Sequence, residues 1–295
     1  EARDGDAFDA AVAQNVKVHM RVYQEAGVEG SCIENWHIEF LRPGEFKTFT
    51  NVDRGWSFGK AANQALGKKF FKLLVDAAHC GDSGLTIAEN QELITKILLD
   101  ARAGDALYGE EGIAGNQSSD RHWIVDPIDG TVNYYYGIPH FCVSIALRVA
   151  GEITVGVIHD PMVGETWTVE KGSPAYLNGK PIQASKRDTL AESILFVGCG
   201  KDGAALRTGI DRFQRASLRA RKMRMMGSAA LGMAYIASGR IDGYIESRIS
   251  LWDIAAGQLL VETAGGKVEL TPIAGYDDAY SIIATNGLIP IEEIL

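Results

Sequence analysis

The stretch Gly109–Asn133 reads GEEGIAGNQSSDRHWIVDPIDGTVN and joins an apolar run to a glycine turn. The run WIV predicts a buried strand that Asp126 closes, and Pro127 removes the next hydrogen bond of the strand ladder. Gly130 allows a backbone geometry that is closed to other residues. Asp126 and Asp129, three residues apart across this turn, can therefore face one point.

Two carboxylates that face one point indicate a metal site. Hard oxygen ligands suit magnesium or manganese, whereas zinc would call for histidine or cysteine. The segment GTVNYYYG behind the turn can begin a helix whose backbone N–H groups favour an anion such as phosphate. The combination predicts chemistry on a phosphate ester. An Asp-Pro turn followed by Asp-Gly is also common surface-loop chemistry, and that alternative stays open for this motif alone.

Further carboxylates lie in two other segments. Glu110 belongs to GEEG, and Asp253 follows the apolar pair of LWDIAAG. Asp253 is predicted to cap the N-terminus of the helix that follows, and a cap alone would need no catalytic role. Taken together, four carboxylates from three segments match a two-metal phosphoester site. They are Glu110, Asp126, Asp129 and Asp253.

Composition narrows the class of protein. The chain has 295 residues, 46% of them hydrophobic, and a net charge of −9 that is spread along the sequence. Nucleic acid is not favoured as the main partner, because phosphate backbones reward clustered lysine and arginine. The run RASLRARKMRMMG gathers basic residues, and within it the alternation of Lys222, Met223, Arg224 and Met225 is interpreted as a half-buried strand whose charged face is exposed to solvent, with an RNA-binding patch as the less favoured alternative. No apolar run approaches the roughly 20 residues of a membrane span, and a cytoplasmic protein is expected.

Periodicity predicts the order of elements. Helices are expected over residues 60–81 and 87–103, the second capped by Thr86, with Glu89 as the partner in a capping box. Short alternating runs then predict an antiparallel meander as far as residue 182. Beyond it, strands alternate with helices, which predicts a second sheet covered by helices.

The predicted division has three parts. Residues 1–59 form an extension of uncertain structure. Residues 60–190 form an α+β subdomain with the GEE and DPIDGT motifs, and residues 191–295 form an α/β subdomain with the WD motif.

Four segments carry a family resemblance. GEEG, WIVDPIDGTVNYYYGIPHFCVSIAL, GSAALGMAYIASGRIDGYIE and LWDIAAGQLLVETAGG resemble the inositol monophosphatase family, lithium-sensitive, magnesium-dependent phosphatases related to fructose-1,6-bisphosphatase. The resemblance runs in order from about residue 60 to the C-terminus. It implies an α/β (α+β) fold built as a layered α-β-α-β-α sandwich, and a homodimer.

The resemblance also implies a ligand set for two or three Mg²⁺ ions, with Mn²⁺ as an alternative. Glu110, Asp126 and the backbone carbonyl of Ile128 correspond to ligands of the first metal. Asp126, Asp129 and Asp253 correspond to ligands of the second. Glu110 also corresponds to a contact of a third, weaker metal.

The same resemblance implies how substrate is held. Gly130 and Thr131 match the family's phosphate cradle, and the Thr131 hydroxyl matches the group that orients the attacking water. Residues that match contacts of the substrate hydroxyls are Asp129, Ser228, Ala229, Glu246 and Asp253. Glu246 could instead be a strand-end carboxylate exposed to water.

The sequence departs from the family pattern in two places. The family has an aspartate three residues after the threonine at the start of its second helix, and here Glu89 stands three residues after Thr86. Glu89 is therefore either a catalytic carboxylate or only the partner in the capping box. The first sixty residues do not match the family's usual start.

The expected function is a Mg²⁺-dependent phosphomonoesterase that uses activated water to hydrolyse a small polyol phosphate, with inositol monophosphate favoured. The alternative substrates are histidinol phosphate, fructose 1,6-bisphosphate and 3′-phosphoadenosine 5′-phosphate. An alternative of another class is a regulatory protein that keeps the fold and binds RNA or RNA polymerase.

Overall fold

The computed structural model describes residues 10–14, 16–18, 20, 24, 36–39, 52–66, 71–74, 86–200, 203–276 and 278–295. The chain divides into two compact units, within residues 1–101 and 102–295. The predicted boundaries after residues 59 and 190 stay predictions. In the described part, no helix is long and apolar enough to cross a membrane.

The first unit corrects one predicted helix. Helix α2 spans Val52–Leu66, and Phe71–Leu74 forms strand β2, parallel to β1 (Trp36–Glu39). The helix predicted over residues 60–81 is therefore confirmed as far as Leu66 and wrong at Phe71–Leu74, whereas residues 67–70 and 75–81 lie outside the described residues. A short apolar run fits a strand as well as a helix, and here the pairing with β1 makes it a strand.

Helix α4 (Ile87–Ala101) begins where predicted. The Glu89 carboxylate accepts hydrogen bonds from the Thr86 backbone N–H at 2.7 Å and from its hydroxyl at 2.9 Å. In return, the Glu89 N–H donates to the Thr86 hydroxyl at 3.2 Å. This is the reciprocal capping box that the sequence predicts. The backbone N–H and the hydroxyl of Thr86 lower the pKa of Glu89, in that order of effect.

The second unit contains a large mixed sheet with the strand order β10-β9-β8-β7-β6-β5-β3-β4. Strands β5 to β10 form the predicted antiparallel meander, and β3 lies parallel to β5. The hairpin of β3 and β4 was not predicted, because its runs are short and rich in glycine. The strands are β3 (Ala106–Gly109), β4 (Gly112–Gly115), β5 (Arg121–Asp129), β6 (Cys142–Val149), β7 (Glu152–Asp160), β8 (Glu165–Glu170), β9 (Tyr176–Leu177) and β10 (Lys180–Pro181).

Strand β5 continues through its proline. The expectation that the strand closes at Asp126 is wrong, because β5 runs on to Asp129. Asp126 pairs with Ser144 and Asp129 with Cys142, so the register shifts between the two aspartates. In a regular strand, residues three apart point to opposite faces. The irregularity at Pro127 therefore allows both aspartates to reach one side of the sheet.

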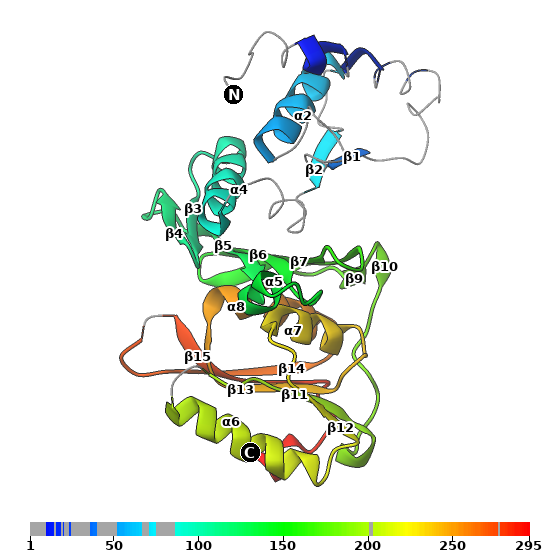
Figure 1. Cartoon of the computed structure of the whole chain (residues 1–295), viewed down its shortest axis with the longest axis vertical. Helices are drawn as coiled ribbons and strands as arrows, with labels where there is room; N and C mark the ends of the chain where they lie inside the picture. The colour runs from blue at the N-terminus through cyan, green and yellow to red at the C-terminus, as the bar shows by residue number, and fades with distance from the viewer. Residues whose placement is uncertain are drawn as a thin grey trace. The chain divides into compact units, whose positions relative to one another are not determined.

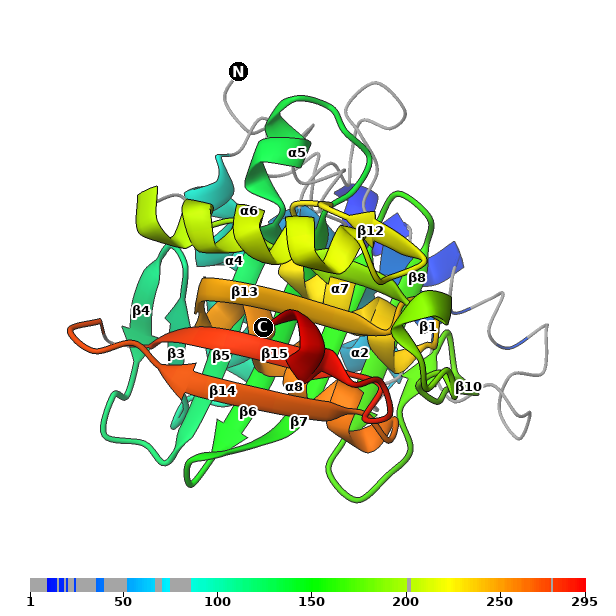
Figure 2. The same cartoon turned by 90° about the horizontal axis from the view of Figure 1, so that it is seen from below.

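The second sheet has the strand order β12-β11-β13-β15-β14. Helices α7 (Ala229–Ala237) and α8 (Leu251–Thr263) lie between the two sheets, and α6 (Gly203–Ser217) covers the other face of the second sheet (Figures 1 and 2). Helices and sheets thus alternate in this unit, as predicted, and form four layers in the order β-α-β-α. The strands are β11 (Ile194–Val197), β12 (Lys222–Arg224), β13 (Gly243–Ser250), β14 (Lys267–Pro272) and β15 (Ala279–Thr285).

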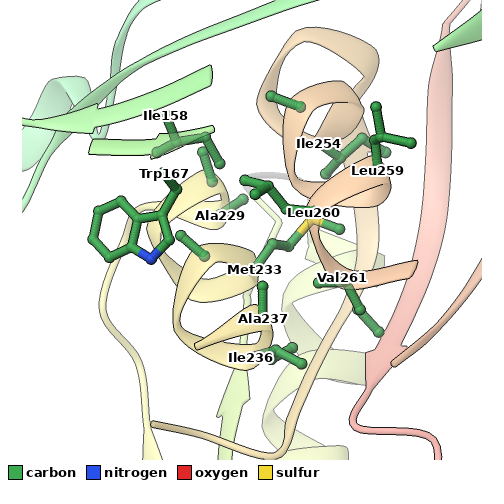
Figure 3. Packing of buried hydrophobic residues seen from close by; sticks show 14 of the residues in the cluster. Ile158, Trp167, Ala229, Met233, Ile236, Ala237, Ile254, Leu259, Leu260 and Val261 are labelled. Atoms are coloured by element: carbon green, nitrogen blue, oxygen red, sulfur yellow. The ribbon is translucent and has the colours of Figure 1, made fainter. Parts of the chain in front are cut away.

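The core lies where α7 and α8 pack together between the sheets (Figure 3). Met233 and Ile236 on α7 and Leu260 on α8 are completely buried, as is Trp167 on β8. A helix that is apolar on every side fits such a position, because sheets cover both of its faces. The two helices therefore hold their N-terminal ends in a fixed place between the sheets.

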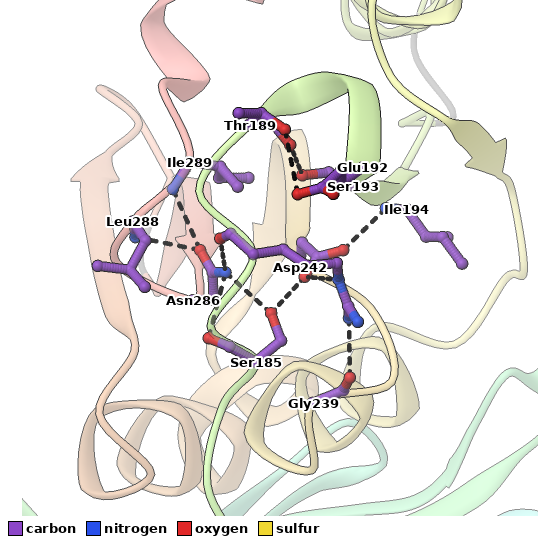
Figure 4. A network of polar contacts seen from close by, with 11 residues as sticks. Ser185, Thr189, Glu192, Ser193, Ile194, Gly239, Asp242, Asn286, Leu288 and Ile289 are labelled. Atoms are coloured by element: carbon purple, nitrogen blue, oxygen red, sulfur yellow. Dashed lines mark hydrogen bonds and ion pairs between the residues drawn. The ribbon is translucent and has the colours of Figure 1, made fainter.

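A polar network joins the chain segment between the two sheets to the second sheet (Figure 4). The buried Asp242 carboxylate accepts hydrogen bonds from the Ser185 hydroxyl, from Arg187 Nε at 2.8 Å and from the Ile194 N–H at 2.8 Å. The Asn286 amide donates to Ser185 Oγ at 2.9 Å and to the Arg187 carbonyl at 2.7 Å. Because its buried polar groups are paired, this network stabilises the connection without an unsatisfied charge.

We expect Gly156→Ala to destabilise the fold by about 1–3 kcal/mol, the usual cost of overpacking. A Cβ at this position on β7 would lie 2.9 Å from the Ala256 carbonyl oxygen and 3.1 Å from Ala256 Cα on α8. The free energy of unfolding in urea measures the effect. Gly104→Ala is the matched control, because an added Cβ there meets no atom within 4 Å. Equal stability of the two variants would contradict the close approach of α8 to β7.

Candidate active site

One cavity of about 880 Å³ gathers the predicted site residues of the second unit. Its walls come from the end of β5, the turn that follows it, the N-termini of α7 and α8, and strands β11 and β13. All of the predicted site residues except Glu89 line it, namely Glu110, Asp126, Ile128, Asp129, Gly130, Thr131, Ser228, Ala229, Glu246 and Asp253. Residues more than a hundred positions apart in the sequence thus meet at one place.

Three aspartates form the centre of the cavity wall. Asp126, Asp129 and Asp253 each offer an oxygen, and these atoms lie within 4.8 Å of one another. Asp126 is only 1% exposed, and its carboxylate accepts the Ile128 N–H at 2.9 Å. Glu110 stands at the end of the β3–β4 hairpin and is exposed, and its charge raises the pKa of both Asp126 and Asp253.

The prediction that Asp253 is the N-cap of its helix is wrong. Helix α8 begins at Leu251 with Ser250 as its N-cap, and the Asp253 carboxylate accepts a hydrogen bond from the Ser250 N–H at 3.0 Å. A carboxylate in the first turn is stabilised by the helix dipole. Trp252 fixes this end of α8, because its ring lies 5.3 Å from that of Tyr108 and its carbonyl accepts the Ser144 hydroxyl at 3.3 Å.

Asp129 holds the N-terminus of α7. Its carboxylate accepts the Ser228 hydroxyl at 2.6 Å, the Ala230 N–H at 2.7 Å and the Ala229 N–H at 3.3 Å. Ser228 is also the N-cap of α7, and its hydroxyl accepts the Leu231 N–H at 3.3 Å. Ser228 and Ala229, which were predicted to meet substrate hydroxyls, therefore contact Asp129, and their role towards substrate stays a prediction.

The turn after β5 requires its glycine. Gly130 has a φ of 95°, and a Cβ there would lie 3.1 Å from the His140 carbonyl oxygen and 3.3 Å from that of Gly227. Thr131 opens the short helix α5 (Thr131–Tyr135), and its hydroxyl donates to the Ile128 carbonyl at 3.0 Å. The two groups with predicted roles, the hydroxyl of Thr131 and the carbonyl of Ile128, thus lie next to each other.

Burial and mutual repulsion make these carboxylates hard to ionise. Burial is the largest cause that raises the pKa of Asp126 and Asp253 well above the usual range, and the charge of Asp129 adds to both shifts. Burial also raises the pKa of Asp129 to about 6, against the hydrogen bonds from Ser228 and α7. Neighbouring charges of one sign favour protonation, whereas a cation would reverse the effect. A compact set of hard oxygen donors fits Mg²⁺ or Mn²⁺.

Glu246 lies inside β13 and not at its end, since the strand continues to Ser250. The side chain is half-buried, so the alternative of an exposed strand-end carboxylate is wrong. Burial and the charge of Asp129 raise its pKa to about 7, although the Tyr244 hydroxyl donates to its carboxylate at 2.5 Å. Its role towards substrate hydroxyls stays a prediction.

Glu89 belongs to the first unit, where its carboxylate is the capping group described above. Its catalytic role stays a prediction. Sequence reasoning missed several residues that also line the cavity, among them Cys199, Met225 and Arg248. The spacing of Arg248, two residues after Glu246, was the available signal. Cys142 and Cys199 are free thiols, and Cys32 and Cys80 lie outside the described residues.

Comparison with known proteins agrees with this geometry. The chain is 38% identical over 209 residues to the fructose-1,6-bisphosphatase/inositol-1-monophosphatase of Thermotoga maritima. This match covers 70% of the chain and 78% of that protein. It is 41% identical over 180 residues to the Nus factor SuhB of Xylella fastidiosa, over 60% of this chain and 65% of that protein.

A solved inositol monophosphatase from Anabaena (Nostoc) sp. PCC 7120 superposes with a TM-score of 0.62 at 37% identity, over 68% of this chain and 80% of that one. This similarity confirms the predicted fold class. The model of the inositol monophosphatase family matches residues 76–284. The chain therefore belongs to the inositol monophosphatase family.

Proposed function

We propose that the protein is a Mg²⁺-dependent phosphatase of small polyol monophosphates, with inositol monophosphate as the first substrate to test. The observation that carries the proposal is the approach of carboxylate oxygens from three aspartates, the buried Asp126 and Asp129 and the half-buried Asp253, to within 4.8 Å of one another beside an open cavity. Carboxylates that repel one another in this way need a counter-charge, and divalent cations supply it. Mn²⁺ is the expected substitute for Mg²⁺.

The proposed division of roles follows the family resemblance. Glu110, Asp126 and the Ile128 carbonyl would hold one ion, and Asp126, Asp129 and Asp253 a second. When bound, such ions lower the pKa of the attacking water, polarise the phosphoryl oxygens and stabilise the leaving alkoxide. The Thr131 hydroxyl, held by its hydrogen bond to Ile128, would orient the water, and the backbone at Gly130 would receive phosphate.

The leaving group would lie between the metals and β13. Glu246 faces the cavity from that strand, and a carboxylate is suited to hydrogen bonds from polyol hydroxyls. This arrangement favours an inositol or sugar phosphate. Histidinol phosphate, fructose 1,6-bisphosphate and 3′-phosphoadenosine 5′-phosphate are the competitors. A homodimer, lithium sensitivity and a cytoplasmic location belong to the same proposal.

A substrate panel tests the activity. Purified protein with Mg²⁺ should release phosphate from inositol 1-phosphate faster than from histidinol phosphate or phosphoadenosine phosphate, and lithium should inhibit the release. Phosphate would be measured colorimetrically, with metal-chelated protein as the control. If no substrate of the panel released phosphate, the proposed activity would be wrong.

Asp126→Asn tests the metal site by two readouts. We expect kcat/KM to fall by about a thousandfold, because metal ions contribute several kcal/mol to such transition states. The melting temperature of the metal-free protein should rise, because one buried repelling charge is gone, while its increase on addition of Mg²⁺ should be lost.

Glu111→Gln is the matched control for Asp126→Asn, because it removes a neighbouring acidic charge that does not line the cavity. Full activity of Asp126→Asn, or an unchanged response to Mg²⁺, would contradict the assignment.

Glu89→Gln decides between the two interpretations of that residue. If Glu89 takes part in proton transfer, as we propose, kcat should fall by roughly 10²- to 10⁴-fold. Thr86→Ala is the control, because it removes a hydroxyl of the same capping box and should cost about 0.5–2 kcal/mol of stability without a comparable loss of kcat. An unchanged kcat in Glu89→Gln would leave this residue as a helix cap.

A second candidate function is binding to RNA or RNA polymerase. Relatives named Nus factor SuhB support it, as do the exposed cations Arg221, Lys222 and Arg224 around β12. If this function holds, RNA mobility shifts or capture of RNA polymerase should weaken when the three residues are changed to glutamine. Absence of binding at low salt would remove this candidate, since phosphate contacts are strongest there.

A further inference from the structure

The two oxygens of the Glu246 carboxylate have different surroundings. Oε2 accepts a hydrogen bond from the Tyr244 hydroxyl at 2.5 Å. The same oxygen lies against the backbone of Gly198, where an added Cβ would collide with it. Within the part of the chain that the structure describes, no hydrogen bond reaches Oε1. The carboxylate is therefore held at one oxygen and can accept hydrogen bonds from a ligand at the other.

Tyr244 contacts Glu246 from inside the core. The two residues lie two positions apart on β13, and such residues point to the same face of a strand. Tyr244 is completely buried and does not line the cavity, whereas Glu246 does. The hydrogen bond thus connects a residue of the core to a residue of the cavity wall.

Core packing leaves the ring of Tyr244 little freedom to move. It stacks on the ring of Phe196 in the neighbouring strand β11, with centroids 4.7 Å apart and an angle of 25° between the planes. Phe196 in turn packs tightly against helix α7, where a Cβ added to Gly232 would collide with its ring. The Tyr244 hydroxyl is therefore held in one place, and a fixed donor restricts the rotamers of the carboxylate that it contacts.

The ionisation of the pair agrees with a donor that holds an acceptor. Burial and the charge of Glu246 raise the pKa of Tyr244 well above its usual range, so the hydroxyl keeps its proton. Burial also raises the pKa of Glu246, and the hydrogen bond from Tyr244 opposes that rise. The bond therefore favours the ionised carboxylate, which only accepts hydrogen bonds.

We propose that Tyr244 is the positioning residue for polyol specificity, because it holds the Glu246 carboxylate where the hydroxyl groups of the leaving group bind. This inference rests on the phosphatase function proposed above and specifies how the site selects a polyol. Tyr244 does not touch substrate in this account, and it acts through Glu246. If the bond served only to satisfy a buried hydroxyl, its loss would affect all substrates alike.

A matched pair of substrates tests the proposal. Cyclohexyl phosphate has the ring of inositol 1-phosphate without the free hydroxyl groups, so it cannot use Glu246. For Tyr244→Phe we expect kcat/KM for inositol 1-phosphate to fall by about tenfold, mainly through KM, which corresponds to one hydrogen bond. The value for cyclohexyl phosphate should stay within about twofold, since no such bond is lost. If cyclohexyl phosphate reacts too slowly, its inhibition constant against inositol 1-phosphate replaces KM.

Two further variants test whether Tyr244 acts through Glu246. Added to Glu246→Ala, Tyr244→Phe should cause no further loss of the preference for inositol 1-phosphate, because coupled residues are not additive. Gly198→Ala should lower the same preference, since its Cβ would displace the carboxylate. Tyr235→Phe is the matched control, because it removes the hydroxyl of a half-buried tyrosine on α7 that does not line the cavity.

The outcomes separate this inference from the proposed function. A folded Tyr244→Phe protein with the wild-type preference would overturn the inference and leave the phosphatase function standing. Equal losses on both substrates would also overturn it, because Tyr244 would then support the fold or catalysis in general. If the wild-type protein used both substrates equally well, recognition of hydroxyl groups would be refuted, and the inference with it. Release of phosphate from neither substrate would refute the phosphatase function itself.

Discussion

Mutual repulsion among closely spaced carboxylates is the main electrostatic cost that this fold has to offset. Asp126, Asp129 and Asp253 are brought within 4.8 Å of one another although burial and their own charges oppose ionisation. A fold can keep such a cluster only if its backbone is held firmly on every side. The irregular end of β5, the glycine turn after it and the N-termini of α7 and α8 provide that support.

The layered arrangement supplies the necessary rigidity. Helices α7 and α8 are apolar on almost every side and are enclosed by two sheets, so their N-terminal ends cannot move without opening the core. Asp129 pairs with the first N–H groups of α7, and Asp253 with the N-cap of α8. Favourable helix-end electrostatics thus offset part of the repulsion. A bound divalent cation would remove the repulsion that remains between the carboxylates.

The local motifs were predictable because their chemistry is local. The capping box of Thr86 and Glu89, the meander of strands and the glycine requirement at residue 130 follow from neighbouring residues, and the structure contains all three. The convergence of Asp253 on the DPIDGT turn could be expected only through the family resemblance. No spacing rule connects segments more than a hundred residues apart.

What the sequence did not reveal depended on tertiary partners. The apolar residues of Phe71–Leu74 are compatible with a helix or a strand, and the segment forms a strand because it pairs with β1. Strand β5 continues through Pro127, which has no N–H to donate, because the register of its pairing with β6 shifts between Asp126 and Asp129. Asp253 is the third residue of its helix because Ser250 and Trp252 fix an earlier start. The place of Arg248 in the cavity wall depends on a ring from a distant loop, Tyr276.

Anomalous diffraction from crystals grown with Mn²⁺ would show whether the three aspartates form a divalent-cation site, because it locates bound ions without reference to activity. We expect two strong peaks in contact with Asp126, Asp129 and Asp253, about 3.5–4 Å apart as in other two-metal sites. Crystals whose bound Mn²⁺ lay elsewhere, with no peak at these three carboxylates, would contradict it.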